Sequence, residues 1–234
     1  MNFFDREILL FINQFAQRSQ VFDLLVQVIA LNDLVKGVPL MTLVWWGWFK
    51  QDKTGSENRE HILTTLALSV IALLIARVLS DLLPGRPRPI SNPALAFRIP
   101  YGAYPYDFVG WSSFPSDHAV LFFFLSTGLL YVSRPAGLLA LAYTTFVICL
   151  PRLYMGYHYP TDIISGALLG IGMACLGNMR GVKFRVASVP MRLLREKPAV
   201  FYALMFLGTY QIADLFNDVR RMSSFFYNYL TGGH

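Results

Sequence analysis

Apolar residues in this chain gather into six long runs, which short polar segments separate. A helix that crosses a bilayer needs about 20 mostly apolar residues. All but one of the runs are shorter than that, and for the third to fifth, which are the shortest, part of each neighbouring loop is expected to continue the helix. The runs extend over Leu34–Phe49, His61–Leu83, Ala119–Val132, Ala136–Leu150, Ile163–Leu176 and Ala199–Phe216. The pattern predicts an all-α fold, a polytopic membrane helix bundle with about six transmembrane helices, in which residues 1–234 form a single domain.

The N-terminal segment before the first run has a different periodicity. Apolar side chains recur there at helical spacing, and polar residues occupy the opposite side. The apolar residues are Phe4, Ile8, Phe11, Ile12 and Phe15, and the polar ones are Asp5, Asn13 and Gln17. This pattern is typical of a short amphipathic helix at the membrane interface, and packing of its apolar side against the bundle is the alternative. Acidic residues at positions 5 and 7 interrupt the segment, so a signal peptide is not expected.

The composition supports a membrane protein. Hydrophobic residues make up 55% of the chain and charged residues only 15%, and the mean hydropathy is +0.45. A soluble domain carries closer to about 25% charged residues, so much of this surface is expected to face lipid. The two cysteines, Cys149 and Cys175, lie inside apolar runs. Their spacing suits neither a metal site nor a disulfide framework, and we interpret both as small apolar core residues.

The formal net charge of +6 indicates an anionic partner. Because the basic residues lie between apolar runs and form no basic–aromatic module, anionic lipid is favoured over nucleic acid. The basic segment Arg180–Lys197 is expected to be a connection that rests on anionic lipid at the cytoplasmic face. Lys36, at the start of the first run, is expected to be an interfacial anchor.

The distribution of basic residues also predicts the orientation. With six spans, ten Lys and Arg residues fall in the loops of the face that contains residues 180–197, and nine fall on the opposite face. Four of those nine lie in loops that carry candidate phosphate ligands, which leaves five against ten. By the positive-inside rule, the long proline-rich loop 84–115 therefore lies outside the cytoplasm.

Two loops on that outer face contain most of the unusual polar residues. The long loop includes residues 85–89, with the sequence Gly-Arg-Pro-Arg-Pro, and residues 114–118, with the sequence Phe-Pro-Ser-Asp-His. The short loop and the helix after it contain Arg152, His158 and Asp162. Charged and imidazole groups at a membrane boundary are costly unless they are paired or functional, so we expect a site here.

The spacing of the histidines and of one aspartate suits nucleophilic catalysis. His158 and Asp162 are four residues apart, so the carboxylate can reach one imidazole nitrogen if a helix begins near Tyr159. That hydrogen bond would fix the tautomer and stabilise positive charge while the other nitrogen attacks. His118, in the first turn of the third predicted helix, is the candidate acid that protonates the leaving oxygen.

Four further residues are candidates for binding a phosphate. Arg88 and Arg152 carry forked donors that match phosphate oxygens. The backbone amides of Ser116 and Asp117 begin the third predicted helix, where free N–H groups and the helix dipole favour an anion. No carboxylate cluster is present that would hold magnesium, so the sequence predicts phosphoryl transfer with neither metal nor cofactor.

With these residues, the sequence resembles the type 2 phosphatidic acid phosphatases, a membrane superfamily that shares its site with vanadium haloperoxidases and bacterial acid phosphatases. The pattern of that family has three parts: a lysine, six residues and Arg-Pro; then Pro-Ser-x-His; then Ser-Arg, five residues, His, three residues and Asp. The matching residues are Arg88 and Pro89, Pro115–His118, and Arg152, His158 and Asp162. The resemblance covers residues 77–170, and the layout of six spans extends it over most of the chain.

Two positions depart from that pattern. Pro151 replaces the serine of the third part, and Asp81 replaces the lysine of the first. A carboxylate at position 81 would repel phosphate, where an ammonium would neutralise it. Arg77, one helical turn earlier, and Arg86 are the candidates to supply the missing positive charge, and Arg86 is therefore included among the expected phosphate ligands.

The resemblance implies both roles and an activity. By this resemblance, His158 would be the nucleophile that forms a phosphohistidine, with Asp162 as its partner. His118 would be the general acid, and phosphate would be bound by Arg88, Arg152 and Ser116. The implied activity is metal-independent hydrolysis of a lipid phosphate or diphosphate in a bacterial inner membrane, with the site facing the periplasm. A polyprenyl diphosphate is favoured over phosphatidate. The alternatives are a lipid phosphotransferase that uses the same histidine and a non-catalytic lipid-binding member of the family.

Overall fold

The computed structural model describes residues 2–50, 55–104 and 112–215, and over these residues it is helical, with no strand. The elements, in order, are α1 (Phe3–Asn13), α2 (Gln20–Leu31), α3 (Asp33–Phe49), α4 (Gly55–Leu82), the 3-10 turn η1 (Pro89–Ser91), α5 (Asp117–Val132), α6 (Arg134–Tyr143), the π-helical η3 (Thr144–Cys149), α7 (Leu150–Tyr154), α8 (Pro160–Gly177), α9 (Arg180–Glu196) and α10 (Pro198–Ala213). The prediction of an all-α fold is confirmed.

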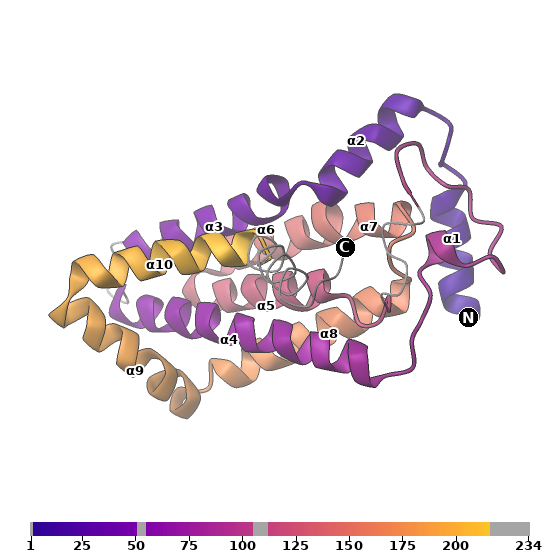
Figure 1. Ribbon diagram of the computed structural model, residues 1–234. Helices are drawn as coiled ribbons and strands as arrows, with labels where there is room; N and C mark the ends of the chain where they lie inside the picture. The colour runs from indigo at the N-terminus through magenta and orange to yellow at the C-terminus, as the bar shows by residue number, and fades with distance from the viewer. Residues whose placement is uncertain (1, 51–54, 105–111, 216–234) are drawn as a thin grey trace, which may run out of the picture.

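Helix α5 lies inside the bundle, packed against α4, α6 and α8 (Figure 1). Most of its side chains are buried, and Phe122 and Phe124 are fully covered. Sixteen residues rise only about 24 Å, less than the roughly 30 Å of a hydrocarbon core. A helix that neighbouring helices surround does not need to match the bilayer, so the N-terminus of α5 can lie within the bundle.

Among the described residues, three helical stretches are long and apolar enough to cross a membrane. They are Gly55–Leu82, the continuous stretch Arg134–Tyr154 and Pro160–Gly177. A fourth span results if α2 and α3, which meet at a bend of 53°, are counted as one. Helices α5 and α10 are shorter and apolar. The protein is therefore an integral membrane helix bundle, and every apolar run of the sequence corresponds to one of its helices, while the count of six spans stays a prediction.

Two helices were not predicted. Helix α2, which Ser19 caps by accepting from the N–H of Phe22, precedes the first expected run, and its twelve residues are too few to form a span alone. Helix α9 occupies residues that we expected to be a basic connection. It is amphipathic, and it packs against α4 with Lys183 and Ala187 buried. Arginines and lysines have good helix propensity, so a basic segment of this length can form a helix once α4 covers its apolar side.

Helix α1 forms as predicted, but its polar side faces inward. Asp5 and Asn13 are buried, whereas Phe4 and Phe11 are exposed. The side-chain amide of Asn13 donates to the carbonyl of Arg98 at 2.7 Å, which ties α1 to the long loop. Phe4 and Phe11 are therefore free to contact lipid, whereas Ile12 of the same apolar side packs against the bundle, so each alternative describes part of this side.

The starts of α5 and α8 lie close together because small residues line their contact. A Cβ atom at Gly166 of α8 would lie 2.7 Å from the carbonyl oxygen of Ser116, just before α5. The backbone N–H of Ser116 donates to the carbonyl of Asp162 at 3.2 Å. Two helix N-termini, with their free N–H groups and positive dipole ends, therefore meet at one place.

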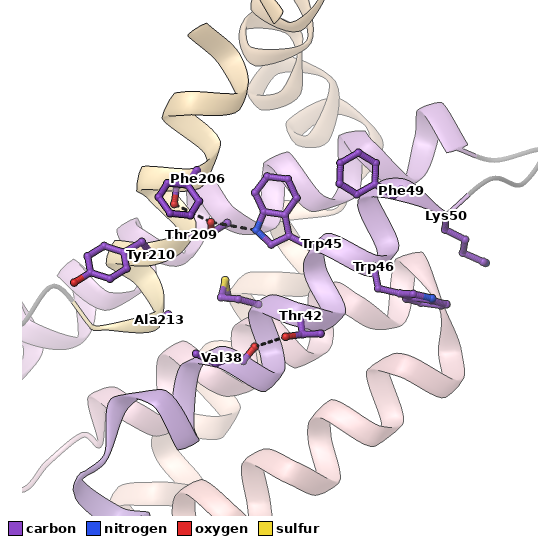
Figure 2. Close-up of a pocket in the computed structure, with 11 residues that line it drawn as sticks. Val38, Thr42, Trp45, Trp46, Phe49, Lys50, Phe206, Thr209, Tyr210 and Ala213 are labelled. Carbon is purple, nitrogen blue, oxygen red and sulfur yellow. Dashed lines mark hydrogen bonds between the residues drawn. The ribbon is translucent and has the colours of Figure 1, made fainter. Parts of the chain in front are cut away.

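An apolar groove of about 690 Å³ lies between α3 and α10 (Figure 2). Aromatic side chains such as Trp45 and Phe206 line it, and the indole of Trp45 donates to the Thr209 hydroxyl at 3.3 Å. None of its described lining residues is among those predicted to bind phosphate.

Three basic residues that entered the charge count of the two faces lie outside the described residues. They are Lys53, Arg220 and Arg221.

Candidate active site

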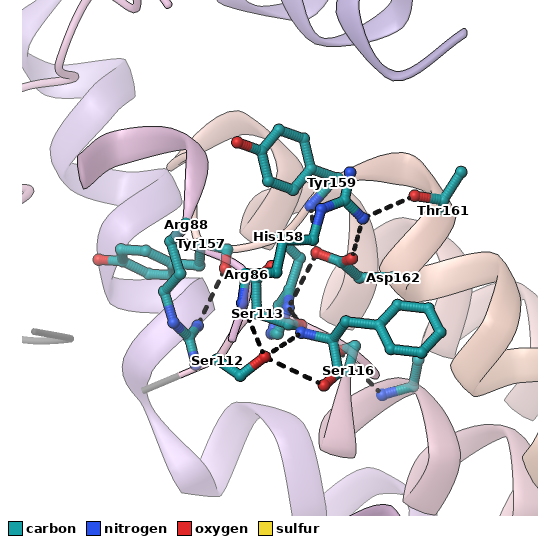
Figure 3. Close-up of polar contacts among 12 residues, drawn as sticks. Arg86, Arg88, Ser112, Ser113, Ser116, Tyr157, His158, Tyr159, Thr161 and Asp162 are labelled. Atoms are coloured by element: carbon teal, nitrogen blue, oxygen red, sulfur yellow. Dashed lines mark hydrogen bonds and ion pairs between the residues drawn. The ribbon is translucent and has the colours of Figure 1, made fainter. Parts of the chain in front are cut away.

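His158 lies between α7 and α8, and its ring is buried (Figure 3). Its Nδ1 atom is 2.9 Å from the carbonyl oxygen of Ser113. A carbonyl only accepts hydrogen bonds, so Nδ1 carries the proton, and in the neutral ring Nε2 carries a lone pair. This Nε2 atom has no hydrogen-bond partner among the described residues. The loop thus holds the imidazole as a nucleophile with one nitrogen anchored and the other available.

The environment keeps the ring of His158 neutral. Burial lowers the pKa of His158, the carboxylate of Asp162 acts in the opposite direction, and the charges of Arg88 and Arg152 lower the pKa further. A depressed pKa means that the lone pair on Nε2 is present at neutral pH.

Asp162 supports His158 less directly than the sequence suggested. Its Oδ2 atom is 3.8 Å from Nδ1 of His158, an ion-pair distance and not a hydrogen bond. The same oxygen accepts from the backbone N–H of Tyr159 at 2.7 Å, which caps α8. The nitrogen of His158 that Asp162 was expected to bind is instead held by the carbonyl of Ser113. A backbone carbonyl in that role carries no sequence signal.

Arg86 differs most from its prediction. Its guanidinium donates to Asp162 at 2.5 Å and lies 3.9 Å from the ring centroid of Tyr159 (Figure 3). It also donates to Asp5 of α1 at 2.6 Å. Asp5 also accepts from the backbone N–H of Thr161 at 2.9 Å and from its hydroxyl at 2.7 Å. The structure therefore places Arg86 between two buried carboxylates, on the Nδ1 side of His158, and not at a phosphate.

His118 is anchored in a similar way to His158. Its Nδ1 atom lies 2.9 Å from Oδ1 of Asp117, and the carboxylate of Asp117 accepts from Arg77 at 2.5 Å. The opposite ring nitrogen, Nε2, is 3.5 Å from Nζ of Lys36 in α3. Asp117 was predicted to contribute its backbone amide, and the structure shows that its side chain orients His118.

Two buried arginines complete a polar cluster that also contains His118, His158, Asp117 and Asp162. Arg88 donates to the carbonyl of Tyr157 at 2.9 Å, and burial lowers the pKa of Arg88 to about 10, so it stays charged at neutral pH. Arg152 donates to the carbonyl of Ala30 at 3.0 Å, at the end of α2. The Nε atom of Arg152 is buried and has no hydrogen-bond partner among the described residues. Charged donors next to a bare imidazole nitrogen are suited to an oxyanion.

Ser116 has a structural contact of its own. Its hydroxyl accepts from the backbone N–H of Ala119 at 3.5 Å and so caps α5. The hydroxyl of Ser113, in contrast, is buried without a hydrogen-bond partner among the described residues, and its carbonyl holds His158. Sequence reasoning missed Ser113 because it lies outside any recognisable motif.

The residues of this cluster fall inside a known family. The model of the PAP2 superfamily matches residues 61–181, just over half of the chain. The chain belongs to the PAP2 superfamily. The histidines, the two buried arginines and the aspartates of the cluster all lie within the matched segment, whereas Asp5 and Lys36 lie before it.

Several bacterial proteins are similar to this PAP2 chain. A bacitracin transport permease protein of Bacillus licheniformis is 40% identical over 60 residues, which are 26% of this chain and 29% of that one. An undecaprenyl-diphosphatase of Bacillus subtilis (strain 168) is 28% identical over 50% of this chain and 55% of its own length. A protein of Escherichia coli (strain K12), provisionally given the same name, is 26% identical over 62% of this chain and 66% of its own length. This chain therefore matches less than two thirds of the length of each relative.

The two departures from the PAP2 pattern have different surroundings. Pro151 is buried in α7, near the end of the continuous helical stretch Arg134–Tyr154 and directly after the π-helical η3. Asp81 is exposed near the end of α4. Arg77 and Arg86, the two candidates to replace the family's lysine, both form ion pairs with carboxylates, Arg77 with Asp117 and Arg86 with Asp5 and Asp162. Within the described residues, no group of three or more His, Cys, Asp or Glu side chains could hold a metal ion.

Proposed function

We propose that this protein hydrolyses a lipid diphosphate, of the polyprenyl diphosphate class, through a phosphohistidine on His158 and without a metal. The observation that carries the proposal is the Nε2 atom of His158, which is bare and buried while Nδ1 is anchored at 2.9 Å. Membership of the PAP2 superfamily and the names of two relatives, both called undecaprenyl-diphosphatase, support it.

In the first step, the lone pair of His158 Nε2 forms a bond to the terminal phosphorus of the substrate. The bond between that phosphorus and the bridging oxygen breaks, and its electron pair stays on the oxygen. His118, protonated on Nε2, gives its proton to that oxygen, and the lipid phosphate leaves. Asp117, which holds Nδ1–H of His118, stabilises the imidazolium before the transfer. Arg88 and Arg152 stabilise the charge on the phosphoryl oxygens.

In the second step, water attacks the phosphohistidine. His118, now neutral at Nε2, accepts a proton from the water, while the oxygen of the water bonds to phosphorus. The P–N bond breaks and returns its electron pair to Nε2 of His158, which releases inorganic phosphate. Both histidines are then in their starting protonation states, so the cycle balances.

The same proposal covers the location of the site. We infer a bacterial inner membrane, since the named relatives are bacterial, with the site facing the periplasm. The basic helix α9 would then lie on the cytoplasmic side, where anionic lipids attract Lys and Arg.

The first experiment measures phosphate release by the detergent-purified protein in the presence of EDTA. A polyprenyl diphosphate and phosphatidate are compared, with His158→Ala beside the wild type. We expect faster release from the diphosphate, no effect of EDTA, and loss of release in His158→Ala together with loss of an acid-labile phosphoenzyme.

A matched control uses a second buried histidine. His61 lies in α4, hydrogen-bonded to Asn178 at 2.7 Å, and stacks on Tyr131 near the far end of α5. His61→Gln is expected to keep phosphate release. Activity that survives in His158→Ala, or that EDTA abolishes, would contradict the mechanism. Transfer of the phosphoryl group to another lipid without release of phosphate would indicate a phosphotransferase.

A further inference from the structure

The side chain of Lys36 is buried next to the catalytic cluster, which the sequence did not predict. Only 4% of Lys36 is exposed, so the expectation of an interfacial anchor is wrong. Its Nζ atom lies 2.7 Å from Oδ1 of Asp33 and 3.5 Å from Nε2 of His118. Asp33 offsets the cost of burying this ammonium, and the second contact, to Nε2 of His118, places the ammonium beside the polar cluster.

The bend between α2 and α3 brings Lys36 to this place. The side chain of Asn32, at the bend, accepts from the backbone N–H groups of Leu34 and Val35 and caps α3. Across from it, the hydroxyl of Tyr143 donates to the carbonyl of Val35 at 2.6 Å, which fixes the first turn of α3 against α6. Lys36 follows directly, and the charges of Arg152 and Asp117 act on its ammonium.

The position of Lys36 relative to His118 indicates which part of a substrate it would meet. Nδ1 of His118 is held by Asp117, so Nε2 is the nitrogen that delivers the proton to the leaving oxygen. Lys36 lies at that same Nε2, whereas the bare nitrogen of His158 marks the attacking side. An in-line displacement places attacking and leaving groups on opposite sides of phosphorus. The ammonium of Lys36 is therefore on the leaving-group side.

We propose that Lys36 binds the leaving phosphate of a lipid diphosphate and so makes the enzyme prefer diphosphates over monoesters. This inference rests on the function proposed above. In a diphosphate, the group that departs is itself a phosphate, whose non-bridging oxygens carry negative charge that an ammonium neutralises. In a monoester such as phosphatidate, the departing group is an alcohol, which offers Lys36 no charge.

Lys36 is a further cation near the cluster in a chain that has Asp81 where the family has a lysine. Arg77, Arg86 and Lys36 are each paired with an aspartate, and of the three only Lys36 contacts Nε2 of His118. Lys36 reaches the polar cluster from a different helix, outside the segment that the family model matches. The positive charge is therefore present, but on the leaving-group side.

A matched control is available at the other end of the bundle. Lys183 is also buried, with Nζ 3.2 Å from Nε2 of His61 and 3.0 Å from Glu57. Lys183 thus forms the same grouping of a lysine, a histidine and a carboxylate, but far from the polar cluster. A change at Lys183 therefore tests what the loss of a buried ammonium does to the fold alone.

The experiment compares kcat/KM for the diphosphate and the monophosphate of one short polyprenol, with phosphatidate as a second monoester. We expect Lys36→Met to lower kcat/KM for the diphosphate about 100-fold and for the monoesters less than about fivefold. Inhibition by orthovanadate, which mimics the transferred phosphoryl group, should stay within about threefold of the wild type. Lys183→Met should leave the ratio of diphosphate to monoester unchanged.

Two further variants keep the test decisive if Lys36→Met does not fold. Lys36→Arg retains the charge and should retain the substrate ratio, while Lys36→Gln should lose it. An unchanged ratio in Lys36→Gln, or an equal fall for all substrates, would overturn the inference and leave the proposed function standing. A wild type that releases phosphate from neither class of substrate would overturn the proposed function and this inference with it.

Discussion

At the level of single residues, the two histidines of the site are anchored in the same way. Each has its Nδ1 atom held at 2.9 Å by a fixed oxygen, the Ser113 carbonyl for His158 and the Asp117 carboxylate for His118. A carboxylate stabilises an imidazolium more than a neutral carbonyl does, because it carries a full charge. In the mechanism proposed above, His118 is the acid and His158 is the neutral nucleophile.

The pH dependence of activity should reflect the depressed pKa of His158. The attacking form is neutral, so activity is present above that pKa and is lost as the pH falls through it. Because burial lowers the pKa below its ordinary value of 6.5, the acid limb of kcat/KM should lie below pH 6.5. Asp162→Asn removes the charge that raises this pKa, so the acid limb should move to still lower pH, and kcat should fall. The substrate titrates identically in both measurements, so a shift toward higher pH in Asp162→Asn would contradict the assignment.

Asp81 should matter little for catalysis despite its place in the family pattern. It is exposed, whereas Arg88, seven residues later, is buried in the cluster. We expect Asp81→Ala to keep kcat/KM within about threefold of the wild type, since a solvated charge interacts weakly. Arg88→Ala should lower it at least about 100-fold in the same assay. A large loss in Asp81→Ala would show that the carboxylate takes part in the reaction.

At the level of elements, α1 is joined to the site by one buried ion pair. Asp5 binds Arg86 and the first turn of α8, and Arg86 in turn binds Asp162. The exposed apolar side of α1 thus faces the membrane interface, while its buried carboxylate, Asp5, binds residues that support His158. Helix α1 therefore acts as a structural part of the active site.

Removing the charge of Asp5 should loosen this connection. Asp5→Asn is expected to lower Tm and to reduce kcat about tenfold with a smaller change in KM, because a charge-assisted hydrogen bond contributes about 1.5–3 kcal/mol. The acid limb of the pH profile should shift as well, since Arg86 would then act on Asp162 alone. The exposed Glu7 in the same helix is the control, and Glu7→Gln should change neither Tm nor kcat.

The contact between α5 and α8 depends on glycine at one position. Gly166→Ala would place a methyl group 2.7 Å from the Ser116 carbonyl, so we expect a loss of about 1–3 kcal/mol in stability and reduced activity. Gly172 in the same helix has open space around it, and Gly172→Ala should instead stabilise α8 by about 0.5–1 kcal/mol. Thermal unfolding in detergent measures both. Equal effects of the two changes would show that the close approach is not rigid.

At the level of the whole molecule, the bundle separates its charged ends. The polar cluster lies where α5 and α8 begin, and the basic helix α9 follows the end of α8. A rise of about 1.5 Å per residue over the 18 residues of α8 places these two regions roughly 27 Å apart along that helix. Our proposal requires such a separation, because it places the two regions on opposite sides of the bilayer.

Labelling of single cysteines tests the orientation. In a background with Cys149 and Cys175 replaced by serine, Ala94→Cys probes the exposed loop at the site end, and Ser188→Cys probes the exposed side of α9. A membrane-impermeant maleimide should label position 94 in cells with a permeabilised outer membrane and position 188 only after lysis. The reverse pattern would place the site in the cytoplasm.

The sequence alone determined the helical bundle and the core of the site, for a local reason. A run of apolar residues in a membrane must satisfy its own backbone hydrogen bonds, so each run of this chain forms a helix wherever it packs. His158 and Asp162 lie within one turn of each other, and Asp117 is next to His118, so their approximate positions follow from the chain itself.

Only the tertiary structure decided which groups hold these residues in place. Asp5 meets Arg86 across 81 positions, and Lys36 meets His118 across 82, so no local spacing reveals either pair. Ser113 contributes a backbone carbonyl, which every residue type has. The burial of the polar side of α1 and the folding of the basic helix α9 likewise depend on the helices packed against them. Contacts between distant segments depend on how whole helices pack, and side-chain pattern along one segment does not encode that packing.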